Sequence, residues 1–197
     1  MSNITYTEVY PAQRTPAWHA FRTGRLTASV AAAALGKSPW ASPKKAYRQI
    51  LGLEPHVSNY YMEHGREMEP VARALYARRS HAEVVETGFW ERSDCHWLGA
   101  SPDALVNDDG CLEIKVSRTY YADLPEHWRI QAQVQLLCTG RDWCDVFHWF
   151  DGFRAEWTVR REGLDDLLYR LKCWYDEFPM RGVEPPRRKA VRHGKKT

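Results

Sequence analysis

The sequence predicts a mixed α/β fold, in which a central mixed β-sheet is flanked by helices. Two observations support this prediction. The first third of the chain carries repeated helix start and stop signals, whereas the middle alternates apolar and polar residues with the period of strands. A helical pattern then separates these strands from two further predicted strands, and an amphipathic helix follows. Helices before, between and after strands are typical of a sheet that is covered on both faces.

Helix caps define the elements of the first third. Thr15, Thr27 and Ser42 each stand directly before a helical pattern, where a hydroxyl caps the first turn. Proline at the first helical position strengthens two of these starts. The predicted helices run from Pro16 to near Gly24, from Ala28 to Leu35, from Pro43 to Gly52, and from about Tyr60 to Arg79 with Pro70 as a weak point.

The rest of the chain alternates between strands and helices. Clusters of Asn, Asp, Ser and Gly separate the apolar segments and indicate turns. The predicted strands are Val84–Trp90, His96–Val106, Cys111–Val116, Trp143–Phe150 and Phe153–Arg160, the last two joined as a hairpin across Asp151-Gly152. The predicted helices are Glu126–Cys138 and Gly163–Phe178.

Length and charge divide the chain into two parts. A chain of 197 residues with 44% hydrophobic residues suits one compact domain, which we expect at 1–178. We expect 179–197 to be a basic, flexible tail, because it opens with prolines and is rich in Lys and Arg. From Arg181 onward seven basic residues accompany one acid, so this segment carries +6 and the remainder −3. The overall charge of +3 therefore gives no reason to assign nucleic-acid binding to the body of the chain.

Several classes of protein are excluded or disfavoured. The longest clear apolar run is only Val30–Leu35, which is too short to cross a membrane. The first ten residues are polar and lack the apolar core of a secretion signal. The five cysteines are scattered and include no Cys-x-x-Cys pair, which disfavours a structural zinc site or a disulfide framework. We therefore expect a cytoplasmic protein with reduced thiols and no membrane partner.

The most informative segment pairs Ser101-Pro102-Asp103 with Leu112-Glu113-Ile114-Lys115-Val116. In a strand, Glu113 and Lys115 project from one face, and a short turn brings Asp103 close to Glu113. Two carboxylates at one point form an oxygen site that suits magnesium or manganese, and a neighbouring lysine can orient a water molecule. The alternative is an amphipathic strand with a surface ion pair between Glu113 and Lys115.

Two polar residues stand on otherwise apolar helix faces. Glu69 shares a face with Met62, Gly65 and Tyr76, so it should be paired, bind a metal, or lie at a helix edge. Gln133 shares a face with Ile130 and Leu137 in the helix after Lys115, and a buried glutamine needs partners. An active cleft or a hydrogen bond between helices would each satisfy it.

A second group of polar residues surrounds the start of the helix at Ala28. Arg22, Arg25, Thr27 and Ser29 combine guanidinium groups, hydroxyls and free backbone N–H groups, which together form an anion-binding pocket. The alternative is an ordinary capped helix with exposed arginines.

Taken in order, these motifs resemble the phage lambda exonuclease family, the YqaJ-like viral recombinase branch of the PD-(D/E)xK nucleases. The resemblance covers about residues 14–178. It is carried by Arg14 through Arg22, Leu26 through Ser29, Gly65 through Glu69, Ser101 through Asp103, Leu112 through Lys115, and Ala132 through Gln135.

The resemblance implies a PD-(D/E)xK core and a specific activity. Such enzymes digest linear double-stranded DNA from its ends in the 5′-to-3′ direction, release 5′-mononucleotides and leave a 3′ single strand. They use two Mg²⁺ ions, for which Mn²⁺ can substitute, and commonly form a homotrimeric ring. A single-strand annealing protein is the natural partner in phage-type recombination, which implies a phage or prophage origin and action in the bacterial cytoplasm.

The resemblance also implies roles for individual residues. Asp103 and Glu113 would be metal ligands together with the backbone carbonyl of Ile114, and Glu69 would hold the second ion. Lys115 would orient the attacking water, and Gln133 would help to position it. The residues implied to contact the 5′-phosphate or DNA are Arg22, Ser29, Thr27, Lys37 and Met62, of which Lys37 and Met62 rest on the weakest alignment.

Two other functions are compatible with the same sequence. An endonuclease with the same core would share Asp103, Glu113 and Lys115, but would have no use for a pocket that binds a terminal phosphate. A catalytically silent protein that binds DNA ends would not need the three residues intact. Degradation of linear but not covalently closed DNA would separate these alternatives.

Overall fold

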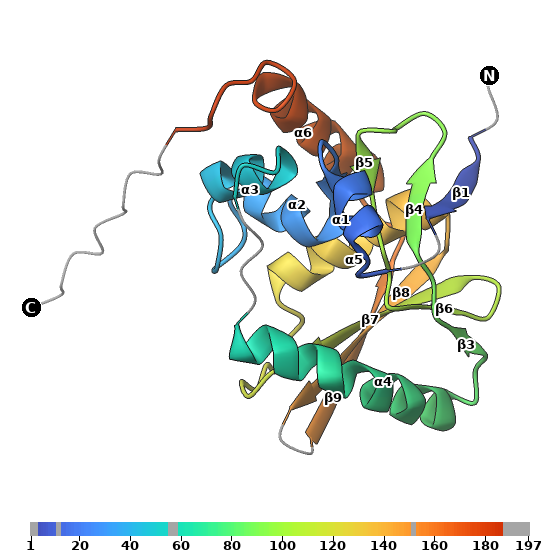
Figure 1. The fold of residues 1–197 in the computed structure, drawn as a ribbon. Helices are drawn as coiled ribbons and strands as arrows, with labels where there is room; N and C mark the ends of the chain where they lie inside the picture. Colours follow the sequence, from blue (N-terminus) through green and yellow to red (C-terminus); the bar gives the residue numbers. More distant parts are fainter. Residues whose placement is uncertain (1–3, 11–12, 55–58, 151–152, 187–197) are drawn as a thin grey trace, which may run out of the picture.

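A five-stranded mixed sheet forms the centre of the molecule in the computed structural model, which describes residues 4–10, 13–54, 59–150 and 153–186 (Figure 1). The strand order is β3-β6-β7-β8-β9, and only β7 and β8 run parallel. The strands span Val84–Val85 (β3), Ala104–Val106 (β6), Gly110–Val116 (β7), Trp143–Phe150 (β8) and Phe153–Arg160 (β9). The predicted mixed α/β class is confirmed.

Helices cover both faces of this sheet. The helices are Pro16–Arg22 (α1), Ala28–Ala34 (α2), Pro43–Ile50 (α3), Tyr60–Ser80 (α4), Glu126–Thr139 (α5) and Leu164–Glu177 (α6). The larger core joins α2, α3, α5 and α6 to one face, whereas α4 packs on the other through Ala72 and Tyr76 (Figure 1). Side chains of β7 alternate between the two cores: Cys111 belongs to the larger core, and Leu112 and Ile114 pack with α4.

The helix boundaries follow the predicted caps, although the Thr27 hydroxyl makes no capping hydrogen bond to α2 and accepts from the Arg22 guanidinium instead. The hydroxyl of Thr15 accepts a hydrogen bond from Trp18 N (3.1 Å), and that of Ser42 accepts one from Lys45 N (3.2 Å). Helix α4 continues through Pro70, which costs one backbone hydrogen bond but does not end the helix. Packing of Ala72 and Tyr76 against the sheet supplies the compensating stabilisation.

Four short strands replace two long predicted ones. Thr87 and Gly88 interrupt the first segment, so that β3 is followed by Phe89–Arg92 (β4). The second divides into Leu98–Gly99 (β5) and β6, because Pro102 has no N–H to donate between them. At Gly99 a Cβ atom would lie 2.0 Å from the Phe89 ring, so only glycine fits there.

Two small sheets extend the fold beyond the prediction. Tyr6–Tyr10 forms a strand (β1) antiparallel to β4, although the sequence suggested only a polar terminus. Its residues, Tyr-Thr-Glu-Val-Tyr, do not alternate between apolar and polar, so the sequence alone does not predict this strand. Leu26–Thr27 (β2) runs parallel to β5 and carries the chain into α2.

Two predicted segments lie wholly or partly outside the described residues. The turn at Asp151-Gly152 and residues 187–197 of the predicted tail belong to this group. Glu184, within the described part, pairs with Lys44 (2.6 Å) and Arg48 (3.3 Å) of α3. Among the described helices, none is long and apolar enough to cross a membrane.

Candidate active site

Three carboxylates from separate elements line one cavity of about 260 Å³. Glu69 comes from the middle of α4, Asp103 from the loop before β6, and Glu113 from the centre of β7. The sequence prediction that Glu69 shares a face with Met62 and Gly65 is confirmed, since both also line the cavity. Segments that are far apart in the chain therefore bring their acids to one cavity beside β7, the central strand of the sheet.

Asp103 is fixed by the strand that carries Glu113. Its Oδ2 accepts a hydrogen bond from Ile114 N at 2.6 Å, and its own N–H donates to Leu112 O at 3.0 Å. Burial raises the pKa of Asp103 well above its usual range, and the nearby charges of Glu113 and Glu69 raise it further. The loop thus holds a carboxylate where negative charge is already in excess.

Glu113 is buried, with 4% of its surface exposed, and is surrounded by donors. Lys115 Nζ lies 2.7 Å from Oε1, and Gln131 Nε2 donates to the same oxygen at 2.6 Å. Gln135 Nε2 donates to the other oxygen, and the Gln135 amide oxygen accepts from the Cys144 thiol. The pair of Glu113 and Lys115 is therefore not the surface ion pair that the sequence left open.

Gln131 bonds to both Glu113 and Lys115. While its amide nitrogen donates to Glu113, its Oε1 accepts from Lys115 Nζ at 2.9 Å. The three side chains form a closed triangle in which each polar group has a partner. Such a triangle holds the lysine ammonium in one place and orientation.

Of the two alternatives for Gln133, the structure does not show a place among the carboxylates, and the side chain bonds instead to the segment before α6. Its Nε2 donates to the carbonyl of Glu162 at 3.1 Å, near the start of α6, and the glutamines that face the carboxylates are Gln131 and Gln135. The sequence argument assumed that α5 buries only one apolar face. Because α5 is buried on nearly all sides, apolar neighbours do not reveal which of its glutamines faces the carboxylates. The spacing of Gln131 and Gln135, four residues apart, was the available signal.

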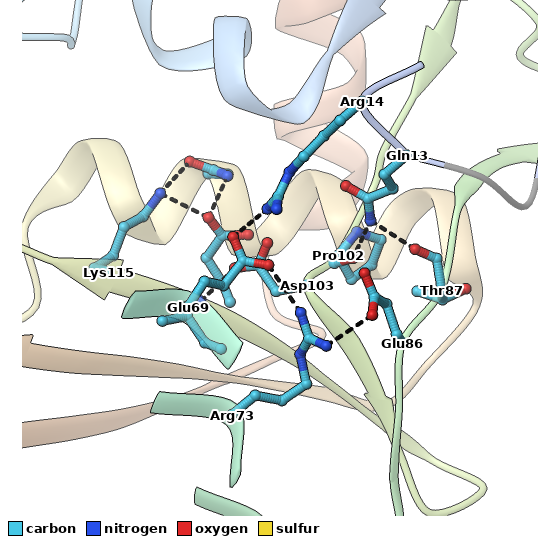
Figure 2. A network of polar contacts seen from close by, with 12 residues as sticks. Gln13, Arg14, Glu69, Arg73, Glu86, Thr87, Pro102, Asp103 and Lys115 are labelled. Atoms are coloured by element: carbon cyan, nitrogen blue, oxygen red, sulfur yellow. Dashed lines mark hydrogen bonds and ion pairs between the residues drawn. The ribbon is translucent and has the colours of Figure 1, made fainter. Parts of the chain in front are cut away.

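Glu69 is held by two arginines. Arg73, one turn further along α4, donates to Oε1 at 2.9 Å, and Arg14 donates to Oε2 (Figure 2). Arg73 also bonds to Glu86 at 2.8 Å. The spacing of four residues indicates the contact with Arg73, whereas the contact with Arg14 depends on where the N-terminal segment lies.

The donor chemistry of the cavity suits a hard divalent cation, since carboxylate oxygens converge on it with excess negative charge. In the part of the chain that is described, no three His, Cys, Asp or Glu side chains form a ready cluster for a metal ion. Both oxygens of Glu69 are bonded to arginines in this structure.

A second cavity of about 260 Å³ contains the predicted anion-binding residues. The Arg22 guanidinium donates to Thr27 Oγ1 and Ser29 Oγ, each at 3.2 Å, and stacks over the Trp18 ring at 4.0 Å. Burial lowers the pKa of Arg22 to about 10, which leaves it protonated at neutral pH. Arg25 also lines this cavity, so all four predicted residues are brought together.

The two remaining predicted residues lie in different surroundings. Met62 lines the carboxylate cavity and is 39% exposed. Lys37 Nζ pairs with Glu126 at 2.8 Å, and the residues described as lining the Arg22 cavity do not include it. The geometry therefore supports Met62 as a residue of the cleft and gives no support for Lys37 in the anion pocket.

Comparison with known proteins agrees with the resemblance read from the motifs. The profile of the YqaJ-like viral recombinase domain matches residues 17–142. An uncharacterized protein of Acanthamoeba polyphaga mimivirus is 29% identical over 154 residues, which are 68% of this chain and 28% of that protein. The chain thus spans little more than a quarter of this curated relative.

Solved structures give a closer match in length. The crystal structure of an alkaline exonuclease from Laribacter hongkongensis superposes with a TM-score of 0.74 at 28% identity, covering 86% of this chain and 95% of that one. A second structure of that exonuclease, in complex with dAMP, gives a TM-score of 0.71 at 30% identity and covers 85% and 92%.

Proposed function

Because the chain belongs to the YqaJ-like viral recombinase family, we propose that it is a metal-dependent exonuclease acting on linear double-stranded DNA in recombination. It digests one strand in the 5′-to-3′ direction, releases 5′-mononucleotides and leaves a 3′ single strand. The convergence of Glu69, Asp103 and Glu113 on one cavity, with Lys115 paired to Glu113, carries the proposal. The similarity to an alkaline exonuclease, and that enzyme's complex with dAMP, support the reaction type and the product.

The proposed cofactor is Mg²⁺, as two ions, with Mn²⁺ as a substitute. Asp103, Glu113 and the carbonyl of Ile114 would hold one ion, and Glu69 would hold the second. A divalent ion bound in such a site would neutralise negative charge on the phosphoryl oxygens and lower the pKa of a bound water molecule. The raised pKa of Asp103 supports cation binding here, since a cation relieves the repulsion among the acids.

The side chains of the chain itself orient the reactants. Lys115 is proposed to orient the attacking water, because its ammonium is fixed by Glu113 and Gln131 and keeps a third donor N–H. Gln131 and Gln135 hold Glu113, and so act as positioning residues. Met62 lies at the rim of the same cavity, where it is proposed to contact the DNA.

The Arg22 cavity is proposed to bind the terminal 5′-phosphate. Arg22, Thr27 and Ser29 offer a guanidinium and two hydroxyls at one point, which is the chemistry that recognises phosphate. Such a pocket has a purpose only at a free end, and it therefore favours an exonuclease over an endonuclease with the same core.

Three further parts of the proposal concern the surroundings of the enzyme. Members of the family commonly close into a homotrimer around DNA, and we extend this assembly, an annealing protein as partner, and action in the cytoplasm of a bacterial host to this chain. Light scattering coupled to gel filtration tests the first of these directly. A mass of one subunit at working concentration, with and without DNA, would reject the ring.

The experiment that tests the function compares three DNA substrates in Mg²⁺. We expect digestion of a linear duplex with 5′-phosphates, slower digestion of the same duplex with 5′-hydroxyls, and none of covalently closed circular DNA. A label at the 5′ end should appear first in mononucleotides. Cleavage of the closed circle would indicate an endonuclease, and binding of ends without cleavage would indicate a silent end-binding protein.

A further inference from the structure

Arg14 lies where the N-terminal segment meets the carboxylate cavity. The preceding residue, Gln13, donates from Nε2 to the carbonyl of Thr87 at 2.6 Å and to that of Pro102 at 2.9 Å (Figure 2). Gln13 is thereby hydrogen-bonded to Pro102, the residue directly before Asp103. Arg14 itself has a φ of 66°, a conformation that non-glycine residues adopt rarely. This unfavourable backbone is held in place while its guanidinium reaches Glu69.

The two arginines on Glu69 differ in how firmly they are held. The Arg73 side chain is 16% exposed and bonds to both Glu69 and Glu86. The Arg14 side chain is 42% exposed and extends to Glu69 from the solvent side. Burial and a second acidic partner fix Arg73, whereas Arg14 can leave Glu69 with a much smaller loss. Arg14 is therefore the exchangeable member of the pair.

A divalent ion and Arg14 cannot share Glu69 freely. Both are positive, and both would bind the Glu69 carboxylate, whose Oε2 accepts from Arg14 and whose Oε1 accepts from Arg73. An ion bound to Glu69 would release the Arg14 guanidinium at the mouth of the cavity, with its anchor Gln13 still in place. A released guanidinium beside this cavity meets the phosphates of any DNA that enters, and arginine binds phosphate with two parallel hydrogen bonds.

We propose that Arg14 is an exchangeable cation of the site, which pairs with Glu69 while no divalent ion is bound and binds a DNA phosphate once an ion occupies Glu69. This inference rests on the proposed function, since it needs both the ion and the DNA. It makes ion binding and DNA binding favour one another through a single side chain. Because ion and DNA each favour the released state of Arg14, the coupling should be lost when Arg14 is replaced.

Titration of Mn²⁺ into the DNA-free, full-length protein tests the first half of the inference. We expect Arg14→Gln to bind Mn²⁺ about fivefold more tightly than the wild type, because the ion no longer displaces an ion pair worth about 1 kcal/mol. Arg79→Gln is the matched control, since Arg79 is 43% exposed and pairs with a single acid, Glu156, in the last turn of α4. Its affinity for Mn²⁺ should stay within about twofold of the wild type.

DNA binding in Ca²⁺ and in EDTA tests the second half. In Ca²⁺, Arg14→Gln should bind duplex ends about tenfold more weakly, with a salt dependence lower by about one phosphate contact. In EDTA the wild type and Arg14→Gln should bind equally. Arg14→Lys keeps the positive charge but loses the paired guanidinium donors. It should change the affinities for Mn²⁺ and for duplex ends in Ca²⁺ in the same directions as Arg14→Gln, but by smaller factors.

The outcomes separate this inference from the proposed function. A wild type that binds no Mn²⁺ would reject the metal-dependent function itself. A wild type that binds Mn²⁺, together with an Arg14→Gln variant of unchanged Mn²⁺ affinity or unchanged DNA affinity in Ca²⁺, would overturn the role of Arg14 alone. Thermal unfolding confirms that each variant is folded, and Arg14→Lys provides the same comparison if Arg14→Gln is not.

Discussion

The hydroxyl of Tyr76 donates to Asp145 Oδ2 at 2.7 Å, and this buried bond joins the helix that carries Glu69 to the sheet that carries Glu113. Asp145 also accepts from Thr158 Oγ1 at 2.6 Å, so the carboxylate is held from two elements. Burial raises the pKa of Tyr76, followed by its hydrogen bond to Asp145, and the phenol remains a donor over the working pH range. The link fixes α4, the helix of Glu69, against the central sheet.

We expect Tyr76→Phe to lower the free energy of unfolding by about 1–3 kcal/mol, because Asp145 loses a hydrogen bond to a buried charge. Denaturant titration at pH 7 measures the change. Tyr169→Phe is the control, since its ring is 69% exposed, and it should change stability by less than about 0.5 kcal/mol. Equal effects of the two substitutions would contradict the importance of the link between α4 and β8.

We expect Gln131→Ala to reduce single-turnover cleavage by about 10- to 100-fold, as is typical when the support of a metal-site carboxylate is removed. The reason is that Glu113 and Lys115 each lose the amide that joins them. Gln133→Ala is the matched control on the same helix, and it should cleave at the wild-type rate because its partner is the Glu162 carbonyl. If Gln133→Ala were the more damaged variant, the assignment of the two glutamines would have to be reversed.

Asp103→Ala, Glu113→Ala and Lys115→Ala should each remove most of the activity without unfolding the protein. The three groups act on one reaction, so the loss in a double variant should be close to that of the worse single variant rather than their product. Single-turnover rates in Mg²⁺ and circular dichroism spectra measure the two effects. Near-normal turnover by Lys115→Ala would contradict the proposed orientation of water by Lys115.

The buried imidazole of His148 should make the fold sensitive to acid. Burial lowers the pKa of His148 from 6.5 to about 4, so the unfolded chain takes up a proton at a pH where the folded protein does not. Stability from this residue is complete above pH 6.5 and falls by up to about 3 kcal/mol as the pH drops to 4. The free energy of unfolding, measured by denaturant titration between pH 7 and 4, should decrease less on acidification for His148→Gln than for the wild type. An equal decrease in both proteins would exclude the effect.

Patterns that act locally were predictable from the sequence. Thr15 and Ser42 cap their helices as expected, and the hairpin of β8 and β9 has the predicted bounds, because caps and alternation depend on neighbouring residues. The pairing of Asp103 with the strand of Glu113 followed from a short turn. These elements could be predicted without knowing which face of the sheet each helix covers.

Contacts that depend on tertiary packing were not predictable in the same way. The choice between Gln131 and Gln133 needed the position of α5, which is enclosed by the sheet and by α6. Arg14 reaches Glu69 from 55 residues away, whereas Arg73 lies four residues along the same helix and its contact could have been expected from spacing. Strand β1 is defined by its partner β4 rather than by its own pattern.

The last prediction concerns the choice of DNA end by the Arg22 cavity. A terminal 5′-phosphate carries more negative charge than an internal diester, and Arg22 with Thr27 and Ser29 offers it charge-assisted hydrogen bonds. Arg22→Ala should therefore slow digestion of 5′-phosphorylated ends more than that of 5′-hydroxyl ends. Since such bonds contribute about 1.5–3 kcal/mol, the preference for the phosphate should shrink by roughly tenfold or more.

The comparison uses single-turnover digestion of two duplexes that differ only in that phosphate. Lys37→Ala is the matched control, because Lys37 pairs with Glu126 and should leave the preference unchanged. The chemistry at Asp103 should survive in Arg22→Ala, since that carboxylate is held by Ile114 N in a separate cavity. Equal losses on both duplexes would mean that Arg22 contributes to structure or general backbone binding, and loss of the preference in Lys37→Ala would move the phosphate site toward Lys37.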